Sequence, residues 1–305
     1  MELFQNILVA VEIDANGEIA FGCRAAVSQS LWLAQRNRAK LTFVHVNDMT
    51  EEMRGIADMQ PQSPLAAHLE RCMRLLESLA ATVPDAAGSA RLLFGDVAPE
   101  LLRETASGGH DLLVVGTRER SGPERALFGS VANRLVRASP CPVWAVKPQQ
   151  QAGFSRVLVA HDLEAGGDMA LALGASLAKR QDAELHVLHV TDNRSDGHDQ
   201  DQVERRSRLA RRLLDECNKL GAGDRAYVAV RNGTPHVEIL DYATAQAIDL
   251  LCMGMQGRTG VARLVIGNTA EKVLPDICCS LLAIRPDAQP AAGEPALVQS
   301  TSGSV

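Results

Sequence analysis

The sequence has few aromatic residues and no excess of basic ones. Phe, Trp and Tyr make up 3% of the 305 residues, too few for a surface on which single-stranded bases stack. The formal net charge is −6, so no basic face for phosphate groups is expected. No apolar run is long enough to cross a membrane, and no apolar leader-like segment precedes the first strand pattern. We therefore expect a cytoplasmic protein that binds neither nucleic acid nor membranes.

The sequence also lacks the usual catalytic and metal-binding motifs. Its seven cysteines form no Cys-x-x-Cys pair and no zinc-ligand spacing. Cys278 and Cys279 are neighbours, which makes an ordinary structural bridge between them difficult. No GxxxxGK(S/T) loop, GxSxG elbow or HExxH helix motif occurs. We expect reduced, structural thiols, no metal site, no bound redox cofactor and no catalytic residue.

Two polar segments resemble functional sites but have simpler explanations. Segment 193–201 contains His198, Asp199 and Asp201, which are metal-ligand types, yet its polarity favours a solvated loop. Segment 107–111, Ser-Gly-Gly-His-Asp, resembles the phosphate loop of ATP pyrophosphatases. That loop follows a first strand, whereas this segment precedes an apolar run. We interpret it as a turn that ends a helix.

The chain repeats itself. Segment 111–116, Asp-Leu-Leu-Val-Val-Gly, reappears as 249–254, Asp-Leu-Leu-Cys-Met-Gly, and segment 141–148 reappears as 279–286, both 138 positions later. Landmarks nearer the amino end match at offsets of 144 and 150 positions, so the first half has the longer loops. A repeat of this length indicates two copies of one domain of roughly 140 residues, near the usual domain size.

Each half alternates short apolar runs with longer amphipathic stretches. Runs that are apolar throughout suit parallel strands buried on both faces by helices. The fold class expected is therefore α/β: two domains, each with an open five-stranded parallel sheet and helices on both faces. The strand-like runs lie near residues 6–11, 41–46, 90–94, 111–116 and 142–147, and near 156–161, 185–190, 225–230, 249–254 and 280–285.

Helix signals fill the intervals between these runs. Leu65–Ala81 and Val203–Leu220 have helical periodicity, and the second is rich in Arg and Glu, which favours a solvated outer side. Pro99 and Pro235, each soon after a glycine, suit the first turn of a helix.

The domain boundaries follow from composition. We expect the first domain over residues 1–148 and the second over residues 154–287, joined by a short polar linker. Residues 288–305 are rich in Ala, Pro, Gly and Ser and have no periodicity, so we expect a disordered tail.

A candidate ligand site lies at the carboxyl ends of the strands in the second half. In an open α/β sheet, ligands bind there, where the strand order reverses. The fourth strand ends in Gly254-Met-Gln-Gly257, and after nine intervening residues Gly267-Asn268-Thr269 opens a helix. Glycines allow the backbone to approach a polyphosphate, and a helix start supplies N–H donors and a positive dipole end. Asp162 suits a ribose or base as an acceptor, and the main chain of Val190 suits adenine.

This arrangement resembles the universal stress protein family, and the tandem layout resembles its two-domain members. Nucleotide-binding members carry Gly-x2-Gly-x9-Gly-Ser/Thr after the fourth strand, and the resemblance covers residues 1 to about 287. It implies two Rossmann-like, adenine nucleotide alpha hydrolase-like domains with the strand order 3-2-1-4-5, and a stress-response or signalling role. The ligand implied is ATP, with Mg²⁺ as its accompanying ion. The nucleotide-binding positions implied are Asp162, Val190, Gly254, Gly257, Gly267, Asn268 and Thr269.

Both halves depart from the family pattern. In the second half, Asn268 stands where Ser or Thr is usual, so the motif there is near-complete. In the first half, Glu119 replaces the second glycine and Glu12 replaces the aspartate of strand 1. A carboxylate repels a triphosphate, and side-chain bulk blocks the backbone; Arg118 and Arg120 offset the charge but not the bulk. The first half therefore offers a degenerate second site made of Glu12, Val46, Gly116, Gly129 and Ser130.

Alternatives to nucleotide binding remain open at this point. Asn268 with Glu271 resembles a capping box and Ser130 suits an N-cap, so these residues could simply begin helices in a protein that has lost its ligand. Such a protein would be a scaffold for protein partners. The enzymatic alternative is slow ATP hydrolysis or nucleotidyl transfer, but no nucleophile–base pair is evident. His45 and His189 occupy equivalent strand positions, which favours packed, hydrogen-bonded histidines.

The fifth strands carry a prediction about assembly. An exposed apolar strand edge invites pairing, and the short linker keeps the two edges close. Single-domain relatives typically dimerise through this edge, so the resemblance implies an internal pseudo-dimer. Further homo-oligomers and unidentified protein partners stay open. The residues expected in or near the contact are Val143, Ala145, Leu281 and Ala283.

Overall fold

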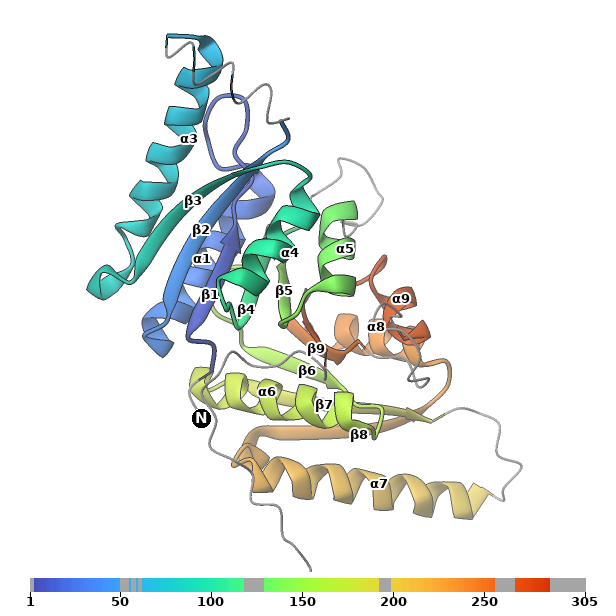
Figure 1. The fold of residues 1–305 in the computed structure, drawn as a ribbon. Coiled ribbons are helices and arrows are strands. Elements are labelled where there is room, and N and C mark those ends of the chain that lie inside the picture. The colour runs from blue at the N-terminus through green and yellow to red at the C-terminus, as the bar shows by residue number, and fades with distance from the viewer. Residues whose placement is uncertain are drawn as a thin grey trace, which may run out of the picture.

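The protein alternates strands and helices in both halves (Figure 1). The computed structural model describes residues 3–49, 62–117, 129–191, 199–255 and 267–285, together with Gly55 and Met59. The elements of the first half are β1 (Asn6–Ala10), α1 (Phe21–Asn37), β2 (Lys40–Asn47), α3 (Pro64–Ala80), the 3-10 turn η1 (Pro84–Ala86), β3 (Gly88–Phe94), α4 (Val97–Ser107), β4 (Leu112–Gly116), α5 (Ser130–Ala138) and β5 (Val143–Val146). Those of the second half are β6 (Arg156–Ala160), α6 (Ala165–Gln181), β7 (Glu184–Thr191), α7 (Asp199–Lys219), η2 (Gly223–Arg225), β8 (Ala226–Asn232), α8 (Pro235–Ala245), β9 (Leu250–Gly254), α9 (Asn268–Val273) and β10 (Ser280–Ile284).

All these strands lie in one ten-stranded sheet, in the order β3-β2-β1-β4-β5-β10-β9-β6-β7-β8. Within each half the strands are parallel and follow the predicted order 3-2-1-4-5. The two open sheets expected are joined into one, as the predicted pseudo-dimer implies. The fifth strands are interior, because β5 and β10 pair antiparallel and join the two sheets. Pairing satisfies backbone groups that a free edge would leave to solvent.

The helices cover the two faces of this sheet in matching sets, and each face has its own apolar core. One core contains buried residues of α1, α3, α6 and α7. The other contains buried residues of α4, α5, α8 and α9, which lie on one side of the sheet in Figure 1. Both cores run through the two halves without a break. The central strands are therefore buried on both faces, which explains their continuous apolar runs.

The junction of the halves has a defined register. Leu281 lies opposite Ala145 and Ala283 opposite Val143, so the four residues predicted for the contact are in it. The Lys147 N–H donates to Ser280 Oγ at 3.0 Å beside the paired strands. Further contacts between the halves are an ion pair of Arg137 with Glu271 at 2.9 Å, and edge-on ring contacts of Phe154 with Trp32 and Trp144.

Several local signals in the sequence are confirmed. Pro235 is the first residue of α8 and Pro99 the third of α4. Segment 107–111 ends α4, as predicted. Its last residue, Asp111, accepts hydrogen bonds from two backbone N–H groups at the start of β1, and the repeated Asp249 does the same at the start of β6. This aspartate ties strand 4 to strand 1 in both halves.

Other expectations are corrected or fall outside the described residues. Asp199 and Asp201 belong to α7, so the expected polar loop is shorter than predicted, and its residues 193–198 lie outside the described part of the chain. The predicted tail, 288–305, also lies outside it. Among the described residues, no group of three or more His, Cys, Asp or Glu side chains could hold a metal ion. None of the helices described there is long and apolar enough to cross a membrane.

Candidate functional site

The candidate site residues of the second half meet at the carboxyl edge of β6 and β9. β6 pairs with β7 on one side and β9 on the other, so the strand order reverses beside it. Ala160 of β6 lies opposite Met253, one residue before Gly254. The Gly267 N–H donates to the Met255 carbonyl oxygen at 3.3 Å, which brings the start of α9 back to the end of β9. Residues from three separate segments therefore share one edge.

The loop after β6 is held by its own side chains. The Glu164 N–H donates to Asp162 Oδ1 at 3.0 Å, and the Leu163 N–H donates to His161 Nδ1 at 2.9 Å. Leu163 has a φ of 66°, a left-handed conformation that is strained for a bulky residue. Two side chains thus fold back onto a strained turn, and the exposed carboxylate of Asp162 is fixed in place at the edge.

His161 orients this loop, a role that sequence reasoning did not assign. Its side chain is buried, and burial lowers its pKa, so the ring is neutral at neutral pH. Nδ1 accepts from the loop, and Nε2 lies 3.3 Å from Asp168 Oδ1 without the alignment of a hydrogen bond. The signal available in the sequence was its position next to Asp162.

Gly254 is required by packing, whether or not a ligand is present. A Cβ atom at Gly254 would lie 2.9 Å from the backbone carbon of Gly166, in the first turn of α6. Gly116 has the same role in the first half, where a Cβ atom would lie 2.2 Å from the carbonyl oxygen of Gly22. At the next residue of α6, Gly167, a Cβ atom would lie 2.6 Å from Asp162 Oδ1. Sequence reasoning missed this Gly166-Gly167 pair, although the doublet was visible.

Val190 directs its main chain toward the same edge. The Leu188 carbonyl oxygen accepts from the His161 N–H at 2.9 Å, so Leu188 faces β6. Alternate residues of a strand turn their N–H and C=O groups to the same neighbour. Val190 therefore points its main chain to the β6 side, beyond the last residue of β6, Ala160. Val46 is placed alike in the first half, because the Val44 carbonyl oxygen accepts from the Val11 N–H at 2.8 Å.

The start of α9 is not a capping box. Gly267 is the N-cap with a φ of −60°, no side chain caps the helix, and Asn268 is its exposed first residue. The Glu271 carboxylate pairs with Arg137 of the first half at 2.9 Å instead of reaching back. Likewise Ser130 is the first residue of α5 and not its cap. The capping interpretation is therefore wrong, and the side chains of Asn268 and Ser130 are not used for capping.

Helix α9 has only six residues, so the dipole expected at its start is weak. Thr269 is its second residue. A phosphate group at this position would therefore be bound by the free N–H groups of the first turn rather than by the dipole of a long helix.

The first half repeats the layout with different side chains. Glu12 is exposed at the end of β1, and its N–H donates to Cys23 Sγ at 3.4 Å. Gly129 is the N-cap of α5, and a Cβ atom there would meet no atom of the described residues within 4 Å. His45 Nδ1 bonds the Val11 carbonyl oxygen at 2.9 Å, and His189 Nδ1 bonds that of His161 at 2.8 Å. Both histidines are hydrogen-bonded strand residues, as predicted.

Four residues that matter to the motif cannot be placed. Gly257 of the second half lies outside the described residues, and so do Glu119, Arg118 and Arg120 of the first half.

The fold defines a tandem α/β protein whose halves join through their fifth strands, each with glycines at the carboxyl edge of strands 1 and 4. The chain belongs to the universal stress protein family, whose profile matches residues 4–147 and 153–285. It is 25% identical to universal stress protein E of Escherichia coli, over 94% of this chain and 96% of that protein.

Solved structures agree in fold. A universal stress protein from Archaeoglobus fulgidus superposes with a TM-score of 0.68 at 20% identity, covering 92% of this chain and 98% of that one. A universal stress protein from Pseudomonas aeruginosa gives a TM-score of 0.67 at 19% identity, covering 94% and 95%.

Proposed function

We propose that the protein is a stress-response module that binds an adenine nucleotide at the carboxyl ends of the strands in its second half. The nucleotide proposed is ATP. One observation carries this proposal. Three groups meet beside β6, where the strand order reverses: a main chain that points toward β6, a carboxylate held in place by a hydrogen bond, and the backbone of a glycine. These belong to Val190, Asp162 and Gly254. Membership of the universal stress protein family supports the same ligand class.

Each group has a role that its chemistry allows. The main chain of Val190 offers a donor and an acceptor to the edge of a base. The Asp162 carboxylate accepts from ribose hydroxyls, and its position is already fixed by the Glu164 N–H. Gly267 and the first N–H groups of α9 receive phosphate oxygens. A Mg²⁺ ion, if it accompanies the nucleotide, takes its ligands from phosphate and water, as this ion commonly does.

The proposed role is binding rather than turnover. A general base must reach the proton that it removes. His161 is the imidazole nearest Asp162 in sequence, but it is buried, and its Nδ1 is occupied by the Leu163 N–H. A phosphate-release assay checks this part: release should stay at the level of protein-free ATP. Release that scales with protein and disappears in Asp162→Asn would establish the slow ATPase instead.

The first half is proposed to bind nucleotide weakly or not at all. Glu12 is one methylene longer than Asp162 at the matching position and lies in a longer loop. Gly129 nevertheless keeps an open N-cap, so the two halves offer matched test positions.

Mass spectrometry of nucleotide carried through gentle purification tests the proposal. Gly267→Glu should deplete the carried nucleotide, because a carboxylate at the start of α9 repels phosphate. Gly129→Glu, the same change in the first half, should leave it in place. Gly254 is a poorer choice, because any side chain there collides with Gly166. Absence of nucleotide, together with no binding at millimolar ATP, would leave the ligand-free scaffold as the correct account.

A further inference from the structure

A hollow lies in the first half at the opposite end of the sheet from the nucleotide edge. Its volume is about 540 Å³, and it is lined by residues at the amino ends of β1, β2 and β4 and by residues 89–93 along the edge strand β3. Asn6 begins β1, Thr42 and Ser89 lie near the starts of β2 and β3, and His110 precedes β4. The candidate nucleotide residues follow the other ends of the strands. The hollow is therefore separate from the proposed function and is open to solvent beside the exposed residues Ser89 and Arg91.

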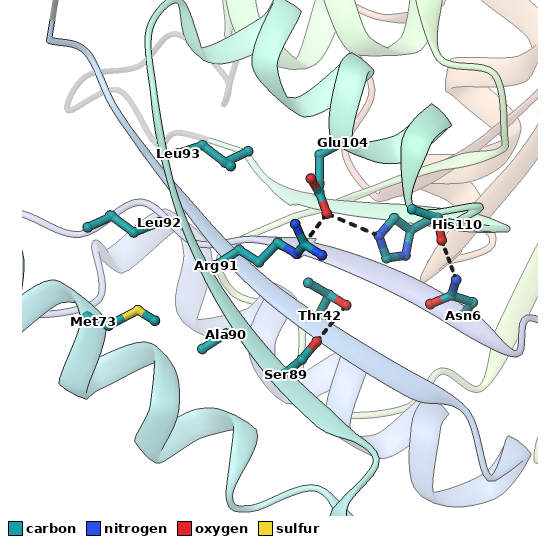
Figure 2. Close-up of a pocket in the computed structure, with 11 residues that line it drawn as sticks. Asn6, Thr42, Met73, Ser89, Ala90, Arg91, Leu92, Leu93, Glu104 and His110 are labelled. Carbon is teal, nitrogen blue, oxygen red and sulfur yellow. Dashed lines mark hydrogen bonds and ion pairs between the residues drawn. The ribbon is translucent and has the colours of Figure 1, made fainter. Parts of the chain in front are cut away.

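Polar groups surround this hollow (Figure 2). The Thr42 and Ser89 hydroxyls bond each other at 2.9 Å, which leaves the pair one further O–H to donate. Arg91 Nε pairs with Glu104 Oε1 at 3.1 Å, so the cation and the carboxylate balance. His110 Nε2 lies 3.9 Å from the same oxygen, and His110 Nδ1 is buried without a hydrogen-bond partner. Because these charges balance, a ligand needs no net charge of its own to bind in the hollow.

The first of the two glycines before His110, Gly108, is explained by this arrangement. Gly108 has a φ of −81°, which any residue adopts, so its backbone does not require glycine. A Cβ atom at Gly108 would instead lie 2.4 Å from His110 Nε2. Glycine at this position therefore leaves room for the His110 ring as it lies in the structure. The second half has Gln246 at the matching position, and Ile248 in place of the histidine.

The second half fills the equivalent space with its own rings. Strand register makes His186 the counterpart of Thr42 and Tyr227 the counterpart of Ser89, and Tyr242 matches Glu104 in the helix. His186 stacks on Tyr227 with ring centroids 5.0 Å apart. Its Nδ1 bonds the Tyr242 hydroxyl at 3.0 Å. Two copies of one fold thus differ at this place: three polar aromatic side chains fill one, and small or charged side chains line the other.

We propose that the hollow of the first half is a binding site for an uncharged, single-ring aromatic or heteroaromatic compound with a hydrogen-bonding substituent. The second half shows that this part of the fold accommodates flat rings carrying polar groups. The Thr42–Ser89 hydroxyl pair bonds the substituent, and Arg91 stacks its guanidinium on the ring face. Leu93, on the same face of β3 as Ser89 and Arg91, supplies apolar contact.

The test uses 4-methylphenol, which mimics a tyrosine side chain, and toluene, which lacks the hydroxyl. In amide NMR titrations of the full chain, 4-methylphenol should shift the signals of residues 89–93 and 110 saturably. Toluene should bind about tenfold more weakly, the effect of one lost hydrogen bond. ATP should not displace either probe. No saturable shift at these residues would mean that the hollow holds only solvent, and would overturn the proposal.

Substitutions at the exposed residue Ser89 test whether the probes bind in the hollow. Ser89→Tyr copies the second half and should abolish binding of both probes by filling the hollow. Ser89→Ala combined with Thr42→Val keeps the space, removes both hydroxyls and should bring the affinity for 4-methylphenol close to that for toluene. Val237→Tyr adds the same ring at an exposed position of α8 and should change nothing. Binding that persists in Ser89→Tyr would show that the probe sits elsewhere, and the proposed site would be wrong.

Discussion

At the scale of single residues, two glycines of the same motif have opposite constraints. Gly116 touches the backbone of α1, since a Cβ atom would lie 2.2 Å from the Gly22 oxygen. Gly129 has an ordinary φ of −60° and open space where a Cβ would be. The first glycine is therefore fixed by packing. The second is free of any such demand in the described structure, so a need for glycine there would come from a ligand.

This difference predicts the stability of two alanine variants. Gly116→Ala should lose about 1–3 kcal/mol of unfolding free energy, because the new methyl group forces strand and helix apart. Gly129→Ala should stay within about 0.5 kcal/mol of the parent, since the N-cap preference and the entropy of the unfolded chain oppose each other. Urea titrations measure both. Equal losses would mean that the close contact of Gly116 with α1 is not present in solution.

Buried histidines give a second residue-scale prediction. Burial lowers the folded-state pKa of His45, His110, His161 and His186 below the usual 6.5. The unfolded chain then binds more protons, so stability is complete above about pH 7 and falls as the pH drops below 6.5. His161→Gln keeps an acceptor for the Leu163 N–H and removes one titrating group. Its unfolding free energy should fall less steeply between pH 6.5 and 5, by up to about 1.4 kcal/mol per pH unit. Identical slopes in urea titrations would contradict a neutral, buried His161.

At the scale of elements, β5 and β10 hold the halves together. Both strands are buried, and they pair in the register that sets Leu281 against Ala145. Their neighbours carry the contact onward, through the Arg137–Glu271 ion pair between α5 and α9. The junction is thus a continuation of the sheet and of both cores.

A charge in this junction should separate the halves. Leu281→Glu places an unpaired carboxylate in an apolar site and should cost about 3–5 kcal/mol, with an expanded X-ray scattering profile. Val237→Glu, on the exposed surface of α8, is the control and should change stability by less than about 0.5 kcal/mol. A Leu281→Glu variant with the parent's scattering profile and cooperative melt would show that the strand pairing does not hold the molecule together.

Elements were easier to predict from the sequence than contacts. The apolar runs at 6–11 and 280–285 match β1 and β10 almost to the residue. A strand that is buried on both faces is apolar throughout, so its own sequence shows where it lies. The role of Glu271 was not predictable, because its partner, Arg137, is 134 positions away. The contact of Gly254 with α6 and the hollow beside Ser89 likewise depend on how distant segments meet. Local patterns carry no information about such distances.

At the scale of the whole molecule, the two halves differ at both ends of their strands, although they are copies of one fold. The second half keeps the near-complete glycine motif at the carboxyl edge and fills its amino end with rings. The first half has Glu12 at the carboxyl edge and a lined hollow at the amino end. We therefore propose that the second half is the half that binds nucleotide.

Calorimetric titration with ATP of the parent, Gly267→Glu and Gly129→Glu tests this assignment most directly. The account predicts saturable binding near one nucleotide per chain for the parent and for Gly129→Glu. It predicts no binding for Gly267→Glu, whose melt should stay cooperative. Asp162→Asn, which keeps the acceptor for the Glu164 N–H but removes the charge, should weaken binding about tenfold. Binding that is lost in Gly129→Glu and kept in Gly267→Glu would contradict the account.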